Sequence, residues 1–135
     1  MRKDTQKERE LDFLLGKTVS RIYVDFALGV QFFEKHLMAT ITIEQTLTFR
    51  DSGEAFTLLP EVADSLAPVL KIFNTTVSVA VVKSDGTLFL EFSRDRSITV
   101  PPHEKYEAWS LNVNDGRKLI CMPGGKIASW AAIKK

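Results

Sequence analysis

Apolar and polar residues alternate in short runs along most of the chain, which is the pattern of half-buried β-strands. The alternation is clearest over residues 28–32, 39–43, 47–50, 88–92 and 97–100. Tight-turn sequences rich in Asp, Asn and Gly separate several of these runs, at residues 51–54, 84–87 and 114–117. Such turns favour hairpins, so the pattern predicts a domain dominated by antiparallel strands.

Two stretches depart from this alternation and follow helical spacing. Three leucines in residues 11–15 share one helical face before Gly16, which predicts a short, charged N-terminal helix over about residues 5–15. Apolar residues also recur at helical spacing over 61–73, where Pro68 should kink or divide the helix. We therefore expect an α+β fold that is mainly antiparallel β, with one N-terminal and one central helix.

The chain can be aligned with itself as two similar halves. Residues 18–32 match residues 76–92, each with two strands around a turn, and residues 41–43 match 98–100. Residues 47–60 match 111–123, and both segments end at a proline. This predicts a single domain over 1–135: a charged helix over 1–15, β-rich halves over 16–60 and 74–133, and the 61–73 helix between them. Chance convergence of β patterns is the alternative explanation.

The second half contains a segment without a counterpart, Pro-Pro-His-Glu-Lys-Tyr-Glu-Ala-Trp at residues 101–109. The two prolines should end the preceding strand. Tyr106 and Trp109 are aromatic residues that serve cores and interfaces equally well. Both could close the end of the core, or both could contact a partner. We expect a division, with Trp109 buried and the hydroxyl end of Tyr106 at the solvent.

Composition narrows the class of protein. Hydrophobic residues make up 44% of the 135 residues, which suits one globular domain, and a formal net charge of +1 argues against nucleic-acid binding through bulk charge. One cysteine excludes an intrachain disulfide. The charged start is unlike a signal peptide, and the apolar runs are too short to span a membrane. We expect a cytoplasmic protein without nucleic-acid or membrane partners.

We find no catalytic or metal-binding pattern and predict no cofactor. His36 and His103 lack ligands or catalytic partners at a recognisable spacing, and Cys121 lies on an apolar strand where a buried thiol is expected. Residues 123–126, Pro-Gly-Gly-Lys, lack the spacing of a phosphate-binding loop. The candidate binding residues are the turn arginines and the inserted segment: Arg94, Arg96, His103, Tyr106 and Trp109. Arg117 and Lys118 could extend a small patch for an anionic partner.

The string Val-Pro-Pro (100–102), Tyr-Glu-Ala-Trp (106–109), Pro-Gly-Gly (123–125) and Trp130 resembles an uncharacterised family of small bacterial proteins. The resemblance runs from about Gly16 to Trp130, leaves the charged extension before Gly16 unassigned, and implies no catalytic residues. Small β-rich proteins of this kind are loosely similar to immunity proteins that neutralise bacterial toxins. The leading hypothesis is a non-enzymatic protein-binding module, and homodimerisation is open. The alternative is a small-ligand-binding or enzymatic domain with its site near His103, Tyr106 and Trp109.

Overall fold

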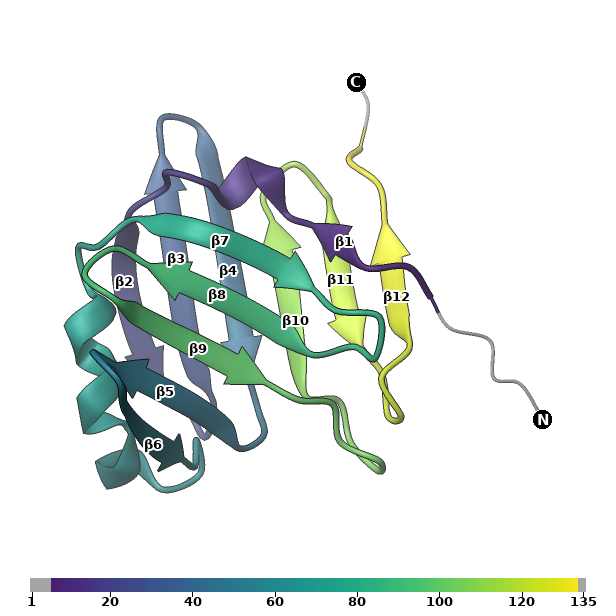
Figure 1. Cartoon of the computed structure of the whole chain (residues 1–135). Coiled ribbons are helices and arrows are strands. Elements are labelled where there is room, and N and C mark those ends of the chain that lie inside the picture. Colours follow the sequence, from purple (N-terminus) through teal and green to yellow (C-terminus); the bar gives the residue numbers. More distant parts are fainter. Residues whose placement is uncertain (1–5, 134–135) are drawn as a thin grey trace.

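The computed structural model describes residues 6–133, which form two six-stranded antiparallel sheets packed face to face (Figure 1). The first sheet has the order β12-β11-β10-β4-β3-β2. Its strands are β2 (Val19–Val24), β3 (Leu28–Glu34), β4 (Leu37–Ile43), β10 (Trp109–Val113), β11 (Lys118–Cys121) and β12 (Ile127–Trp130). The mainly antiparallel β architecture predicted from the alternation is therefore confirmed.

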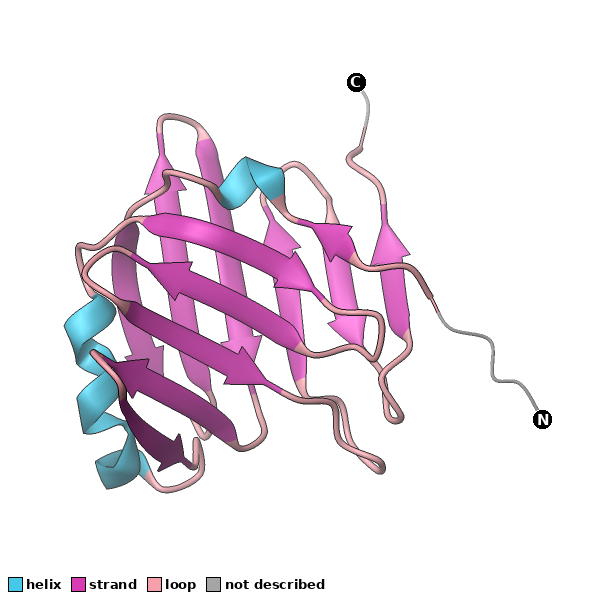
Figure 2. Cartoon of the chain, viewed as in Figure 1, coloured by secondary structure: helices cyan, strands magenta, loops and turns pink. Residues whose placement is uncertain are grey.

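The second sheet has the order β1-β7-β8-β9-β5-β6. Its strands are β1 (Arg9–Glu10), β7 (Val77–Val82), β8 (Leu88–Phe92), β9 (Arg96–Val100), β5 (Leu47–Asp51) and β6 (Glu54–Leu58). The strands of the two sheets cross at a steep angle, as in an orthogonal sandwich (Figure 2). Two edges of the sandwich result, one between β6 and β2 and the other between β1 and β12.

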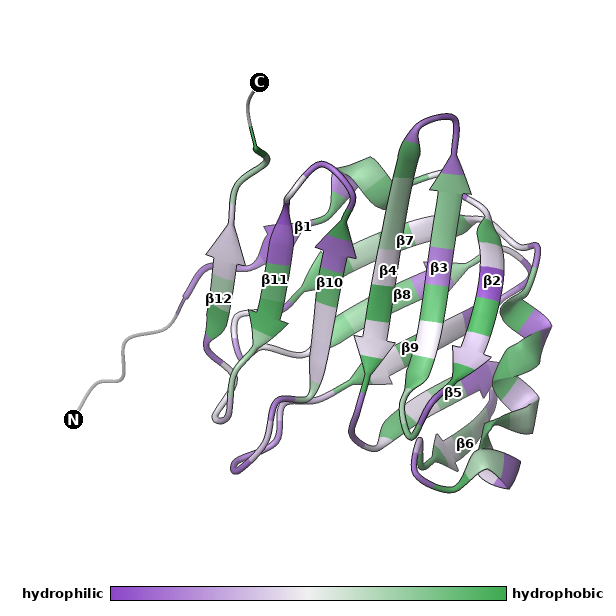
Figure 3. Ribbon diagram, turned by 180° about the vertical axis from the view of Figure 1, so that it is seen from behind, coloured by the Kyte–Doolittle hydropathy of each residue, from purple (hydrophilic) through white to green (hydrophobic). Residues whose placement is uncertain are grey.

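Alternate side chains of each strand point into the space between the sheets, and this space is the core. Figure 3 shows the resulting alternation of hydrophobic and hydrophilic positions along β3 and β4. The largest fully buried side chains are Trp109, Phe32, Phe49 and Phe92. Since burial stabilises by about 25 cal/mol per Å² of apolar surface, these aromatic residues contribute strongly to the packing that holds the sheets together.

The two halves follow the same strand order. In the first half, β2-β3-β4 form a meander in one sheet and β5-β6 a hairpin in the other. In the second half, β7-β8-β9 and β10-β11 repeat this order with the sheets exchanged. The equivalent residues Thr18 and Thr76 pair with each other, and equivalent register shifts follow Val19 in β2 and Val77 in β7. The paired strand order predicted from sequence is thus present.

One part of the predicted alignment is shifted by two residues. Leu47 was matched with Leu111, but the pairings Phe49–Ile98 and Leu111–Ile41 make Phe49 the equivalent of Leu111. Leu47 therefore corresponds to Trp109. The shift arises because β9 is joined to β10 by residues 101–108, whereas β4 is joined to β5 by residues 44–46. Sequence alternation of period two cannot distinguish registers that differ by two residues.

The predicted N-terminal helix over residues 5–15 is wrong for the residues that the structure describes. Residues 1–5 lie outside them. Arg9–Glu10 is instead the short edge strand β1, paired with β7, and Asp12–Leu14 is a single 3-10 turn, η1. The backbone N–H of Leu11 donates to the carbonyl of Ala80 at 2.9 Å. Pairing with the sheet edge has overridden the helical spacing of the three leucines.

The predicted central helix over 61–73 is a 3-10 helix, η2 (Ala63–Ile72), and it lies at one edge of the sandwich rather than between the halves (Figure 1). Its buried residues are Leu66, Val69 and Ile72. A 3-10 helix has three residues per turn, so a spacing of three places them on one face. Pro68 also lacks the N–H that an α-helical hydrogen bond would need. The α-helical component of the predicted α+β class is thus not found in residues 6–133.

Candidate functional site

Trp109 anchors the inserted segment in the core. Its side chain is 0% exposed, and its Nε1 donates a hydrogen bond to the carbonyl of Gly86 at 3.0 Å. The Sγ of Cys121 lies 3.5 Å from the same carbonyl, and burial raises the pKa of this thiol to about 11. The expectations of a buried Trp109 and a buried Cys121 are both confirmed. Neither side chain is available to a ligand, so Trp109 supports the candidate site from beneath.

Two glycines bring the turns around Trp109 into backbone contact. A Cβ at Gly86 would lie 2.3 Å from the carbonyl oxygen of Gly125, and a Cβ at Gly125 would lie 2.1 Å from that of Asp85. Both glycines also have positive φ, at 95° and 101°. The β7–β8 turn and the β11–β12 turn are therefore packed too closely for any side chain. This contact gives the 101–108 segment a rigid support.

His103 shapes the inserted segment. Its Nδ1 accepts hydrogen bonds from the backbone N–H groups of Lys105 and Tyr106, at 3.0 and 3.3 Å. Its carbonyl accepts a bond from Gly124 at 2.9 Å, and its ring packs against the Tyr106 ring with centroids 5.1 Å apart. One ring nitrogen of His103 is thus occupied in closing the turn. This use of the imidazole favours a structural role over that of a general base.

The exposed aromatic residues gather beside this turn. Tyr106 is 60% exposed, as expected, and Phe26 in the β2–β3 turn is 85% exposed. Both line one shallow depression of about 590 Å³, together with Glu44, Lys105, Glu107 and Met122 among others. We call the surface formed by Phe26, Glu44, Tyr106, Glu107 and Met122 the aromatic loop face.

Phe26, in the segment Asp25-Phe26-Ala27, is not among the candidate binding residues that the sequence predicts. Its φ is 51°, a left-handed conformation that is uncommon for a large side chain. A bulky aromatic residue in a short connection between two strands is the sequence signal that could have indicated Phe26. Binding residues often lie on loops, where a large apolar side chain is not needed for the core.

The structure separates the two arginine candidates from the other three. Arg94 lies in the β8–β9 turn and Arg96 begins β9, whereas His103, Tyr106 and Trp109 follow its end. Arg96 is held by Asp51, with Nε to Oδ1 at 3.1 Å, and it also donates to the carbonyl of Lys71 at 3.2 Å. Lys71 completes the cluster with a bond of 3.0 Å to Asp51. These bonds hold the pKa of Asp51 below its usual value, and the bond from Lys71 contributes most to this lowering. Arg96 therefore connects β9, β5 and η2.

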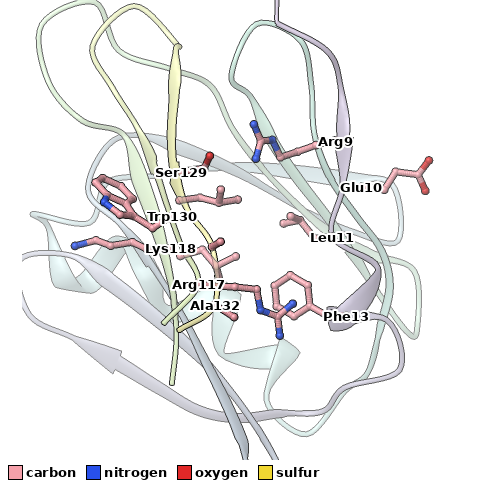
Figure 4. Close-up of a pocket in the computed structure, with 12 residues that line it drawn as sticks. Arg9, Glu10, Leu11, Phe13, Arg117, Lys118, Ser129, Trp130 and Ala132 are labelled. Carbon is pink, nitrogen blue, oxygen red and sulfur yellow. The ribbon is translucent and has the colours of Figure 1, made fainter. Parts of the chain in front are cut away.

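A second concave region lies between the edge strands β1 and β12, and we call it the β1–β12 cleft (Figure 4). It has a volume of about 500 Å³ and an apolar floor that includes Leu11, Leu111 and Leu119. The other residues beside it include Arg9, Glu10, Phe13, Arg117, Lys118, Ser129 and Trp130. Gln6 connects the N-terminal segment to the β11–β12 turn, because its side chain bonds to the backbone of Gly125 and Ile127.

Two cation–aromatic pairs lie beside β11 and β12, the Arg117 pair in the cleft and the Lys118 pair on the outer face of the sheet (Figure 4). The guanidinium of Arg117 lies 4.1 Å from the centre of the Phe13 ring, and the ammonium of Lys118 lies 5.5 Å from that of Trp130. Asp115 accepts hydrogen bonds from Arg117, and these hold the pKa of Asp115 below its usual value. The sequence predicted that Arg117 and Lys118 could share a turn patch with Arg94 and Arg96. The structure places Arg117 in this cleft and Lys118 with Trp130 on the outer face of the sheet.

Among residues 6–133, no group of three or more His, Cys, Asp or Glu side chains is arranged to hold a metal ion. No helix of the same residues has the length and apolar character needed to cross a bilayer.

Comparison with known proteins identifies one family. A family model described as a family of unknown function (DUF6188) matches residues 11–131. No curated protein and no solved structure matches the chain. The family match confirms the resemblance to an uncharacterised family, while the bacterial origin of the chain stays a prediction.

Proposed function

The chain belongs to the family of unknown function DUF6188, and we propose that it is a non-enzymatic, cytoplasmic module that binds another protein through the aromatic loop face. The observation that carries the proposal is the exposure of Phe26 and Tyr106 on one depression. Aromatic side chains are enriched among the residues that dominate binding energy at protein interfaces. Two of them held on turns are an unusual feature of a surface that only faces water.

The support beneath this face also favours binding. Tyr106 projects from a turn closed by His103, and Trp109 fixes the end of that turn in the core. A side chain held in place before binding loses less conformational entropy when a partner arrives. The aromatic loop face is therefore suited to act as a rigid contact surface.

Charges around the depression indicate the chemistry of the partner. Glu44 and Glu107 line it beside a single cation, Lys105. A partner surface with exposed Lys or Arg residues would complement this arrangement. The small, β-rich construction is similar to that of immunity proteins, and this class analogy leads us to propose a toxin-type protein as the partner. A second copy of the chain is the competing partner.

The alternative of a small-ligand or enzymatic site at His103, Tyr106 and Trp109 receives less support. Trp109 is fully buried, and Nδ1 of His103 is bound by backbone N–H groups. The depression beside them is lined by Tyr106 but not by His103 or Trp109.

The test uses the product of the gene adjacent to the one that encodes this chain. Isothermal titration should give saturable binding to the wild type and at least tenfold weaker binding to a Phe26→Ser/Tyr106→Ala double variant. Phe33→Ser is the matched control, since Phe33 is also exposed but lies outside the depression. Equal affinities for the wild type and the double variant would refute the assigned face, and self-association of the wild type alone would favour homodimerisation.

A further inference from the structure

The two edges of the sandwich are equivalent positions in the two halves. Helix η2 contacts β6 and β2 and so closes the first edge. The equivalents of β6 and β2 are β11 and β7, and these strands flank the second edge. A counterpart of η2 would therefore lie between β11 and β7, which is where the β1–β12 cleft is found.

Backbone hydrogen bonds show the same equivalence between turn η1 and the end of η2. The N–H of Gly16 donates to the carbonyl of Val77, as that of Asn74 donates to Val19. The N–H of Lys17 also donates to Leu14, as that of Thr75 donates to Ile72. Turn η1 thus corresponds to the last turn of η2, with Leu14 buried like Ile72.

Upstream of η1, the two halves differ. Helix η2 continues back through Leu66, which is 2% exposed and fills the first edge. The N-terminal segment instead runs as β1 along β7, and β12 is added to β11. The second edge therefore has no helix equivalent to the upstream part of η2. The β1–β12 cleft lies there over Leu11, Leu111 and Leu119, which are 4%, 1% and 8% exposed.

Two arginines direct their charges to the β1–β12 cleft. Arg9 and Arg117 point toward it, whereas the side chains of Glu10 and Lys118 are directed away from it (Figure 4). The charge of Arg117 is balanced by Asp115 at 2.9 Å, whereas Arg9 makes no ion pair with any residue from 6 to 133. In Figure 4 the guanidinium of Arg9 is directed across the cleft toward the hydroxyl of Ser129. Both groups can donate hydrogen bonds to a carboxylate, and Arg can do so with two parallel bonds.

We propose that the β1–β12 cleft binds a small carboxylic acid with an apolar chain. The chain lies on Leu11, Leu111 and Leu119, and the carboxylate is bound between Arg9 and Ser129. The cleft volume of about 500 Å³ lies within the roughly 300–1,000 Å³ range of small-molecule sites, and its mostly apolar lining with a few polar groups is typical of them. This ligand site is separate from the aromatic loop face, since the two regions share no lining residue.

Octanoate is a suitable probe, because it joins a carboxylate to a flexible apolar chain. Trp130 directs its indole to the outer side of β12 and Trp109 is buried, so backbone amides rather than tryptophan fluorescence should report on the cleft. We expect saturable amide shifts in nitrogen-15 spectra, confined to β1, η1, β11 and β12. Octanol, which has the same chain without the charge, should bind at least tenfold more weakly.

Two arginine variants distinguish binding at this site from a general effect of positive charge. Arg9→Gln should weaken octanoate binding about tenfold, whereas Arg21→Gln, at an exposed position on β2, should leave it unchanged. Thermal melts of both variants check that the fold is retained. Equal binding of octanol and octanoate, an unaltered affinity in Arg9→Gln, or amide shifts outside the cleft would each overturn the proposal.

Discussion

Tyr106 and Trp109 lie three residues apart and have opposite environments. Trp109 is 0% exposed with its Nε1 bonded to Gly86, while Tyr106 is 60% exposed. Trp109→Ala should therefore lower the free energy of unfolding by about 3–5 kcal/mol, as large-to-small core changes do. Tyr106→Ala should change it by no more than about 0.5 kcal/mol, as exposed substitutions do. Urea unfolding of both variants tests this, and a Trp109→Ala protein as stable as the wild type would contradict the core assignment.

Gly124 and Gly125 are neighbouring glycines that differ in one respect. Both have positive φ, at 88° and 101°, but only Gly125 approaches another backbone closely. Gly124→Ala should cost about 1–2 kcal/mol from the left-handed conformation alone. Gly125→Ala should cost about 1–3 kcal/mol more, because the β7–β8 turn must move. Thermal or urea unfolding of the pair measures the difference, and equal losses would show that the close approach is unimportant.

Sequence could predict the burial of some residues but not the partners of others. Trp109 was predicted to be buried because it leads directly into the strand of Leu111 and Val113. Cys121 was predicted to be buried because it lies on an alternating apolar strand. Arg96 was a candidate for binding because turn charges usually face water, but Asp51 and Lys71 meet it only through the fold. A bulky aromatic residue in a short connection could have indicated Phe26, but its position beside Tyr106 depends on the packing of the two turns.

At the scale of the elements, strands were predicted more accurately than helices. Period-two alternation reports directly on which face of a strand is buried. In the 61–73 segment, Leu70 and Phe73 suggested α-helical spacing, but both are exposed, whereas Leu66, Val69 and Ile72 are buried at a spacing of three. The N-terminal leucines form part of a 3-10 turn because β7 offers an unpaired edge to the preceding residues.

The bonds of Asp51 connect η2 to β5 and β9, and they make this connection sensitive to acid. Because the folded-state pKa of Asp51 is lowered from 3.8, its stabilising effect is fully present above that value and is lost as the pH falls through the lower, folded pKa. Asp51→Asn should therefore be less stable than the wild type at neutral pH. This deficit should shrink below about pH 4.

Urea unfolding between pH 2 and pH 7 measures this dependence. Asp64→Asn is the control for loss of one negative charge, since Asp64 is exposed at the start of η2 and outside the cluster. A deficit of Asp51→Asn that is the same at every pH would contradict the role assigned to the carboxylate.

At the scale of the whole molecule, the order of strands was predictable and their division between sheets was not. Matched turns and prolines indicated two similar halves, and both halves have the same strand order. Each half, however, places its hairpin in the sheet formed by the meander of the other, as in β4–β10 and β9–β5. Alternation shows that a strand has a buried face but does not name its neighbour. The β1–β12 cleft depends on this exchange and was therefore beyond prediction.

The central claim is that the aromatic loop face contacts a protein partner while the rest of the sandwich serves as its support. Hydrogen exchange of the chain, alone and with the product of the adjacent gene, tests the claim most directly because it locates the contact. We predict slower exchange in residues 24–28 and 103–107, and unchanged exchange in β1, β11 and β12. Slower exchange confined to those edge strands, with residues 24–28 and 103–107 unaffected, would contradict the account.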